Sequence, residues 1–399
     1  MYSTVAYLNS NDGSSILAFG EKDRVVIDYK GDLNAYSSFL ARNEGEHKFG
    51  YLSYDLKEQL HGLKSENTDH AKFPLLFFWV PEYVVRMDHE NFEFIQGDKS
   101  AESLDFVNTI LEEETDCNFH HYQFDFQPRI SKEEYLNTIV KLKNHLQKGD
   151  IYEINFCQEF FAENVEINYL FDAYFKLNHL THAPQSAFLK FDQYTILCGS
   201  PERYIRKQDN RLITQPIKGT APRGKNSEED VLNKKHLSED PKERSENVMI
   251  VDLVRNDLSI VALKDTVQVD ELCGIYSYDT VHQMISTVSC EIAEDTEFLD
   301  ILKATFPMGS MTGAPKVRAM ELIEEYESFK RGVYSGSIGY IQPNGNFDFN
   351  VVIRTLLYNA NEKYLSCAVG SAITIGSDPE QEFEECMVKV KRIMDGMNE

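Results

Sequence analysis

Residues 196–218 read ILCGSPERYIRKQDNRLITQPIK, with apolar residues in both halves and Gln208-Asp209-Asn210 between them. This pattern predicts a β-hairpin of residues 196–206 and 211–218. Glu202 and Lys218 are equally distant from Asn210, so we expect them to lie opposite one another on one face. A carboxyl and an amine would then share a small site, although an ordinary cross-strand ion pair has the same pattern.

Lys218 stands at the end of the second predicted strand, in Pro216-Ile217-Lys218-Gly219, and a Gly/Pro-rich turn follows it. Apolar and small neighbours favour desolvation of the amine, and desolvation favours the neutral, nucleophilic form. A lysine that extends to water from a strand end would have the same neighbours. These residues alone leave both interpretations open.

The composition excludes several classes of function. A formal net charge of -25 over 399 residues opposes binding to nucleic acid or to an anionic membrane, which need a basic surface. The longest apolar run, residues 73–81, is too short to span a bilayer. Residues 1–12 lack the pattern of a signal peptide, and the seven cysteines form no C-x-x-C pair. We therefore expect a cytoplasmic protein with free thiols.

Residues 1–115 form a β-rich N-terminal part, with strands expected at 24–29, 49–54 and 75–87. We expect residues 111–116 to be a solvated connector, and residues 125–399 to be the catalytic region of one intertwined globular unit. Ser131 and Glu134 form a capping box for a helix over 131–148, whose apolar face is Tyr135, Ile139, Leu142 and Leu146.

Further charged residues stand within predicted elements of the C-terminal half. A helix over 241–257 has Met249, Ile250, Leu253 and Val254 as its expected apolar face, and a β-meander follows over 332–375. Arg354 lies within the predicted strand 347–358 and needs an anionic partner, either a substrate carboxylate or a structural one.

Two carboxylates open the predicted C-terminal helix. Glu382 and Glu385 stand three residues apart in its first turns, after Asp378-Pro379. Such carboxylates commonly interact with the helix dipole. Two of them at this spacing can also hold Mg²⁺, which prefers oxygen ligands.

Six stretches together resemble the chorismate-utilising enzymes, which include the anthranilate, aminodeoxychorismate, isochorismate and salicylate synthases. The stretches are residues 200–203 (SPER), 216–220 (PIKGT), 246–257 (ENVMIVDLVRND), 313–316 (GAPK), 331–336 (RGVYSG) and 378–385 (DPEQEFEE). The resemblance covers roughly residues 130–395 in order. It implies an α+β fold in which two packed antiparallel β-sheets are flanked by helices.

The resemblance also implies a role for each matching residue. Glu202 matches the general acid that protonates the departing 4-hydroxyl of chorismate. The implied Mg²⁺ ligands are Glu246 and Glu385, with Glu382 as a further acid at the metal. The implied substrate-binding residues are Tyr334 and Arg354, which grip the enolpyruvyl carboxylate, Thr220, Gly370, Ser371 and Ala372, with Lys389 balancing charge beside the metal.

Two positions indicate the reaction within this family. Isochorismate and salicylate synthases have a water-activating lysine where this chain has Glu153, and anthranilate synthases have alanine where it has Lys218. Aminodeoxychorismate synthases typically carry the latter lysine. The implied path is attack of Lys218 on ring carbon 2 with loss of the 4-hydroxyl, then addition of ammonia at carbon 4, which gives 4-amino-4-deoxychorismate for 4-aminobenzoate and folate synthesis.

Some features depart from the family pattern or are missing. Gln283 stands where family members commonly have histidine, and the sequence has no amidotransferase constellation or Leu-Leu-Glu-Ser motif. Ammonia would therefore come from solution or from a separate glutaminase subunit. Anthranilate synthase component I is the alternative enzyme, and a catalytically silent chorismate-binding subunit is the alternative from another class.

Overall fold

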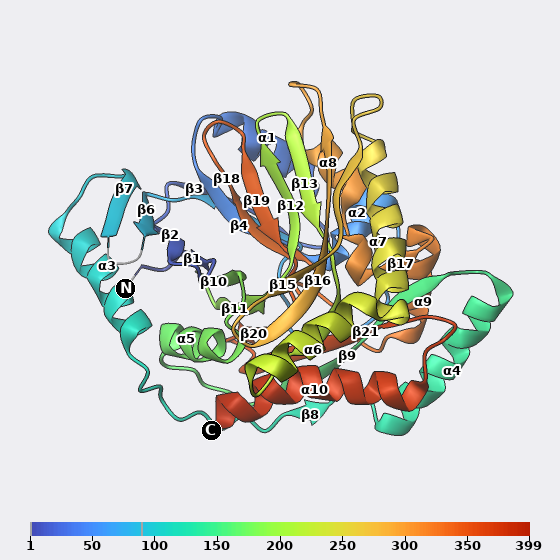
Figure 1. The fold of residues 1–399 in the computed structure, drawn as a ribbon. Helices are drawn as coiled ribbons and strands as arrows, with labels where there is room; N and C mark the ends of the chain where they lie inside the picture. The colour runs from blue at the N-terminus through green and yellow to red at the C-terminus, as the bar shows by residue number, and fades with distance from the viewer. Residues whose placement is uncertain (1, 89–90) are drawn as a thin grey trace.

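The computed structural model describes residues 2–88 and 91–399. They form two large antiparallel β-sheets that pack face to face, with helices around them (Figure 1). This arrangement confirms the predicted α+β fold of two packed sheets flanked by helices. Strands from the N-terminal part and from the C-terminal half occur in both sheets.

The first sheet has eleven strands among the described residues. In spatial order its strands are β17 (Gly313–Ala314), β9 (Glu153–Ala162), β21 (Tyr364–Ile373), β20 (Thr355–Asn359), β11 (Tyr194–Ser200), β10 (Gln185–Phe191), β1 (Val5–Asn9), β2 (Ser14–Phe19), β6 (Tyr83–Asp88) and β7 (Asn91–Gln96), with β8 (Gln127–Pro128) beside β9.

The second sheet contains the predicted turn at residues 208–210. In spatial order its strands are β14 (Ile217–Pro222), β16 (Val281–Glu291), β13 (Arg211–Gln215), β12 (Arg203–Gln208), β19 (Phe347–Asn350), β18 (Ser337–Ile341), β4 (Lys48–Leu52), β5 (Leu76–Val80) and β3 (Asp23–Ile27), with β15 (Gln268–Ser277) beside β16.

Helices cover the outer surfaces of both sheets. They are α1 (Asn34–Arg42), α2 (Lys57–His61), α3 (Ala101–Thr115), α4 (Lys132–Lys148), α5 (Leu170–Thr181), α6 (Ser227–Glu239), α7 (Pro241–Ser259), α8 (Phe298–Thr305), α9 (Lys316–Tyr326) and α10 (Pro379–Asn398), with 3-10 turns η1 (Tyr54–Leu56) and η2 (Gly309–Met311). α10 packs on β21, α4 and α5, whereas α7 packs on β14 and β16 of the second sheet (Figure 1).

Three strands that the sequence predicted as continuous are each divided between the two sheets. Residues 75–87 become β5 and β6, residues 196–206 become β11 and β12, and residues 347–358 become β19 and β20. Pro81 and Pro201 stand at two of these crossings, where proline cannot donate a ladder hydrogen bond. The chain therefore passes repeatedly from one sheet to the other.

Alternation along the strands builds two hydrophobic cores. In β10, Ala187, Leu189 and Phe191 face the core between the sheets, whereas Phe188 faces the core under the helices. The predicted apolar face of α4 is buried in the second of these cores, and the Ser131 capping box is present. Burial of apolar area on both faces of the first sheet is what fixes its position.

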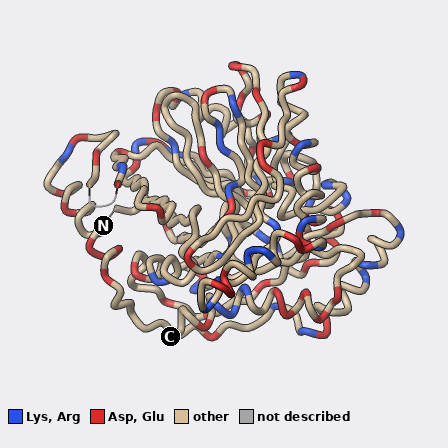
Figure 2. The backbone as a smooth tube through the Cα atoms, viewed as in Figure 1, with Lys and Arg blue, Asp and Glu red and all other residues tan. Residues whose placement is uncertain are grey.

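The structure also tests the predicted connector at residues 111–116 and shows how charge is distributed over the chain. The predicted connector at residues 111–116 is wrong, because α3 continues to Thr115 on a buried face of Phe106, Val107 and Ile110. Acidic residues are interspersed with basic ones over sheets and helices alike (Figure 2). None of the helices in the described part of the chain is both long and apolar enough to cross a membrane.

Candidate active site

The two crossings that carry Glu202 and Arg354 run side by side. β11 pairs with β20 in the first sheet, and β12 pairs with β19 in the second. Between the sheets, Val351 N–H donates to the Glu202 carbonyl at 3.0 Å, and Gly199 N–H donates to the Arg354 carbonyl at 3.0 Å. These bonds satisfy backbone N–H and C=O groups that have no partner within either β-sheet. They also fix the two charged side chains close to the junction of the sheets.

The predicted register of the hairpin is wrong. β12 and β13 do form a hairpin, but Gln208 pairs with Arg211, and a bulge places Arg203 opposite Gln215. Glu202 precedes β12, and Lys218 lies in β14, which pairs with β16. They are therefore not a cross-strand pair, although each acts electrostatically on the other's pKa.

Lys218 contacts a carboxylate that belongs to the opposite sheet. Its Nζ donates to Glu153 Oε1 at 2.7 Å, and the two side chains are 10% and 2% exposed. Burial lowers the pKa of Lys218, but the carboxylates of Glu153, Glu246 and Glu202 act in the opposite direction and leave that pKa raised. The structure therefore corrects the interpretation of Lys218 as a neutral amine among apolar neighbours. Its charged neighbours are acids, and they favour the ammonium form.

Glu202 is one of these acids and is 5% exposed. Burial raises the pKa of its carboxyl to about 7, although Lys218 and Arg354 oppose this shift. A carboxyl group with that pKa is partly protonated near neutral pH and can donate a proton. The position and protonation of Glu202 therefore suit a general acid.

Arg354 has an unusual backbone and an unpaired side chain. Its φ is 52°, in the left-handed region that non-glycine residues seldom adopt. No hydrogen bond or ion pair to its guanidinium occurs among residues 2–88 and 91–399. Burial lowers its pKa to about 10, and Arg392 contributes in the same direction. A partly buried cation without a protein partner is suited to an anionic ligand.

Tyr334 lies in the turn after α9 and is 3% exposed. A buried ion pair supports this turn: Arg331 Nη2 lies 2.6 Å from Glu327 Oε1, and both side chains are 1% exposed. Arg331 also donates to the carbonyls of Met311, at 2.6 Å, and Asn155, at 2.8 Å. The Arg331 guanidinium therefore joins α9, η2 and β9 around the Tyr334 turn.

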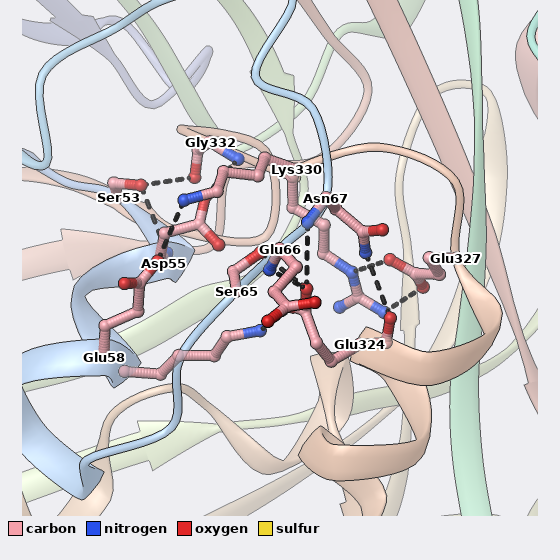
Figure 3. Close-up of polar contacts among 12 residues, drawn as sticks. Ser53, Asp55, Glu58, Ser65, Glu66, Asn67, Glu324, Glu327, Lys330 and Gly332 are labelled. Atoms are coloured by element: carbon pink, nitrogen blue, oxygen red, sulfur yellow. Dashed lines mark hydrogen bonds and ion pairs between the residues drawn. The ribbon is translucent and has the colours of Figure 1, made fainter. Parts of the chain in front are cut away.

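The N-terminal part of the chain contributes to the same support (Figure 3). Asp55 Oδ2 accepts from Gly332 N–H at 2.9 Å, and Ser53 Oγ donates to the Gly332 carbonyl at 2.8 Å. Glu324 accepts from Lys57 Nζ at 3.2 Å and from Ser65 Oγ at 2.7 Å. Sequence reasoning missed this network, because its members lie more than 250 residues apart and only the 331–336 motif gave a signal.

The predicted metal ligands lie on α7 and α10, and Lys242 lies between Glu246 and Glu382. Glu246 is 8% exposed and Glu382 is 2% exposed, and Lys242 Nζ lies 3.8 Å and 3.5 Å from them. Glu385 pairs with Lys389 at 2.6 Å. Within the described part of the chain, no three His, Cys, Asp or Glu side chains form a group that could hold a metal as they stand.

The remaining predicted site residues lie on β14, β21 and α10. Gly370, Ser371 and Ala372 pair with β9, and the pairs between β21 and β20 end at Ser366, so their other edge is not covered by β20. Lys389 Nζ donates to the Gly370 carbonyl at 3.3 Å. Thr220 is exposed and opposite Gln283. Among the described residues, none of these side chains forms a hydrogen bond or ion pair with Lys218, whose partner is Glu153.

Gln283 and His282 differ in what they contact. Gln283 is 1% exposed, and its Oε1 has no hydrogen-bond partner in the described structure. His282 is fully buried, with Nε2 3.1 Å from Asp230 Oδ1 and Nδ1 2.9 Å from Ser277 Oγ. The imidazole is thus held by α6 and by the end of β15, and it does not replace the histidine that the resemblance implies at the next position.

A cavity of about 670 Å³ lies away from these groups, between β1, β2 and the β18–β19 hairpin. Arg203 and Arg206 line it, whereas Glu202, Lys218 and Glu246 do not. The charged groups at the junction of the sheets, and not this cavity, define the candidate site.

Comparison with known proteins agrees with this fold. The chain belongs to the chorismate binding enzyme family, whose sequence model matches residues 4–395. It is 35% identical over 350 residues to aminodeoxychorismate synthase component 1 of Klebsiella aerogenes, which covers 86% of this chain and 76% of that protein. The Escherichia coli (strain K12) protein of the same name is 40% identical over 270 residues, which are 68% of this chain and 59% of that protein.

A solved structure gives the same architecture. Anthranilate synthase component I from Streptococcus pneumoniae TIGR4 superposes with a TM-score of 0.81 at 26% identity, covering 96% of this chain and 92% of that one. Relatives of two different activities are therefore similar to this chain, and residues at the site must separate them.

Proposed function

We propose that this chain aminates chorismate at ring carbon 4 with ammonia and gives 4-amino-4-deoxychorismate. The observation that carries this proposal is the position of Lys218, a buried amine that the fold brings to Glu202 and Glu153 from separate elements. An amine at this point can act as a covalent nucleophile. The names of the two relatives from Klebsiella aerogenes and Escherichia coli support the same assignment.

Each residue then has a role in the proposed reaction. Arg354 and Tyr334 hold the enolpyruvyl carboxylate, and Glu202 donates a proton to the departing 4-hydroxyl. Lys218 attacks ring carbon 2, and ammonia displaces it by adding at carbon 4. Covalent attachment at carbon 2 blocks direct amination there, which would lead towards anthranilate.

Mg²⁺ fits the donor chemistry of α7 and α10. Glu246 Oε1 is buried without a hydrogen-bond partner, and Glu382 and Glu385 offer further oxygen ligands of the kind that Mg²⁺ prefers. We propose that Glu246 and Glu385 hold the ion, with Glu382 bound directly or through water. When bound, Mg²⁺ would neutralise the ring carboxylate and polarise the conjugated diene.

The product of the reaction tests the proposed function. The protein is incubated with chorismate, Mg²⁺ and ammonium, and the product is identified by NMR. The proposal requires an amine on carbon 4 and a retained enolpyruvyl ether. Anthranilate would assign the chain to the alternative activity, and the absence of any product would favour a silent chorismate-binding subunit.

We expect the rate to fall as the pH rises through about 7, at a constant concentration of free ammonia. Glu202 must be protonated to act as an acid, and burial raises its pKa to about 7. Glu202→Gln cannot donate the proton and is expected to lose about 10² to 10⁴-fold in rate. A wild-type rate that stays constant between pH 6 and 8, measured as initial product formation, would contradict this role.

Glu246→Gln is expected to raise the Mg²⁺ concentration needed for half-maximal activity by about 10 to 100-fold or more, because a full negative charge is removed from the site. The matched control is Asp252→Asn on the same helix, whose side chain is 66% exposed. Calorimetric titration of Mg²⁺ into both variants gives a second measurement. Equal Mg²⁺ dependence of Glu246→Gln and wild type would leave Glu246 as a structural carboxylate.

The chain is expected to use ammonium but not glutamine, and to gain glutamine-dependent activity when a glutaminase subunit is added. Hydrolysis of the amide needs an activated cysteine. Six of the seven cysteines are buried, and burial raises the pKa of the Cys198 thiol to about 11 and of Cys367 to about 12. Transfer of ¹⁵N from amide-labelled glutamine by the chain alone would contradict this expectation.

A further inference from the structure

Glu153 has more hydrogen-bonding capacity than the fold uses. It comes from β9, is 1% exposed, and accepts from Lys218 through Oε1. Its Oε2 is buried and has no hydrogen-bond partner among the described residues. A carboxylate that only supported the fold would be expected to have both oxygens satisfied, as buried polar groups usually are. The unused oxygen of Glu153 can accept a further hydrogen bond or a proton.

The charges around Lys218 create a need for a base. Five acids from β9, the β11–β12 crossing, α7 and α10 interact electrostatically with its amine, namely Glu153, Glu202, Glu243, Glu246 and Glu385. Together they favour the ammonium form, which has no lone pair and cannot attack carbon 2. The proton must therefore leave Lys218 before the covalent bond forms.

Glu153 is the acid placed to take that proton. Among the described residues, Glu153 makes the one hydrogen bond that the Lys218 amine has. Neither Lys218 nor Glu153 has a hydrogen bond or ion pair to Glu246, Glu382 or Glu385 in that part of the chain. Glu202 cannot serve, because it must itself be protonated when the 4-hydroxyl departs.

We infer that Glu153 is a catalytic base, which accepts the Lys218 proton before attack on carbon 2 and returns it after the lysine is displaced. This inference rests on the proposed function. The resemblance gives isochorismate synthases a water-activating lysine at this position. In this chain Glu153 would instead remove a proton from the enzyme's own nucleophile.

The protons and bonds of this sequence balance. A proton moves from Lys218 Nζ to Glu153, the neutral amine forms a bond to carbon 2, and the carbon 4–oxygen bond breaks as the hydroxyl leaves as water with the Glu202 proton. Ammonia then forms a bond to carbon 4, and the bond between carbon 2 and Lys218 breaks. The new ammonium group gives a proton to Glu202, and Glu153 returns its proton to Lys218.

Burial makes the proton transfer feasible. An ion pair removed from water loses hydration on both partners, whereas a neutral amine and a neutral carboxylic acid lose much less. Both side chains are at most 10% exposed, so the neutral pair is closer in free energy to the ion pair than it would be in water. The transfer also needs no exchange with solvent.

The test compares the pH dependence of covalent adduct formation in wild type and Glu153→Gln. Each protein is mixed with chorismate and Mg²⁺ without ammonium, quenched over a time course, and measured by intact mass. Wild type transfers the proton within the pair, whereas Glu153→Gln must lose it to solvent. We expect the variant to be about 10² to 10⁴-fold slower at pH 7. The wild-type rate divided by the Glu153→Gln rate should fall about tenfold for each unit by which the pH rises, as long as the pH stays below the pKa of Lys218.

Using the ratio removes the contribution of Glu202, which is the same in both proteins. Glu153→Asp keeps a carboxylate and is expected to restore the wild-type form of the pH profile, although at a lower rate. A ratio that is constant with pH, or equal rates for wild type and Glu153→Gln, would overturn the role of Glu153 as a base. If wild type itself forms no adduct, the proposed covalent function fails and this inference fails with it.

Discussion

Lys218→Ala is expected to abolish the amination of chorismate at carbon 4. The substitution removes the nucleophile, and loss of a covalent nucleophile costs on the order of 10⁴-fold or more in rate. Any remaining amination should be redirected to carbon 2, because no covalent bond protects that carbon. The measurement is the rate of formation and the identity of the product from chorismate, Mg²⁺ and ammonium.

The structure adds a necessary control to this experiment. Lys218→Ala leaves Glu153 buried without its partner, and an unpaired buried charge destabilises a protein. Lys218→Gln also lacks the nucleophile but retains a hydrogen-bond donor for Glu153, so it separates chemistry from stability. Lys225→Gln, at an exposed position, controls for the loss of a lysine nearby. A Lys218→Gln protein that forms the 4-amino product at the wild-type rate would contradict the covalent path.

Arg331→Met is expected to lower the free energy of unfolding by about 3–5 kcal/mol. It leaves Glu327 as an unpaired buried carboxylate and removes the donors to the Met311 and Asn155 carbonyls. Because the same guanidinium supports the turn that carries Tyr334, we also expect a higher KM for chorismate. Urea denaturation and steady-state kinetics measure the two effects.

Arg318→Met is the matched control for this substitution. Arg318 lies on α9, the helix that precedes Arg331, and pairs with Glu321 at 2.8 Å, but its side chain is 39% exposed. An exposed pair of this kind contributes at most about 1 kcal/mol. Equal losses of stability in Arg331→Met and Arg318→Met would show that the buried network is not what holds the Tyr334 turn.

Local patterns in the sequence predicted the local elements well. The capping box at Ser131 and Glu134 and the spacing of Tyr135, Ile139, Leu142 and Leu146 gave α4 with its buried face. Asp378-Pro379 likewise begins α10, where Asp378 caps the helix. These signals depend on residues within a few positions of one another, so a single sequence contains them in full.

Sequence patterns did not show where the chain changes sheets. A strand that crosses between two packed sheets keeps its β-forming residues, so its hydrophobic pattern continues through the crossing. Pro81 and Pro201 mark two crossings and gave a signal that could have been used. The crossing at Arg354 has no proline, and only the fold shows its left-handed backbone.

Sequence patterns also did not predict that charged side chains are buried on α7. We expected Met249 and Leu253 on the buried face of α7, but the buried face includes Glu246 and Asp257. Lys316 Nζ lies 2.6 Å from Asp257 Oδ2, and this partner from α9 makes the burial tolerable. A helix face that buries acids beside cations from distant parts of the sequence cannot be recognised from the spacing of apolar residues alone.

The covalent adduct on Lys218 is the most direct test of the central claim. The protein is mixed with chorismate and Mg²⁺ in the absence of ammonium, quenched, digested and mapped by mass spectrometry. The proposed reaction predicts that the peptide containing Lys218 gains the mass of chorismate less one water, and that added ammonium removes this mass as the 4-amino product appears. A 4-amino product formed at full rate without any modification of Lys218 would contradict the claim.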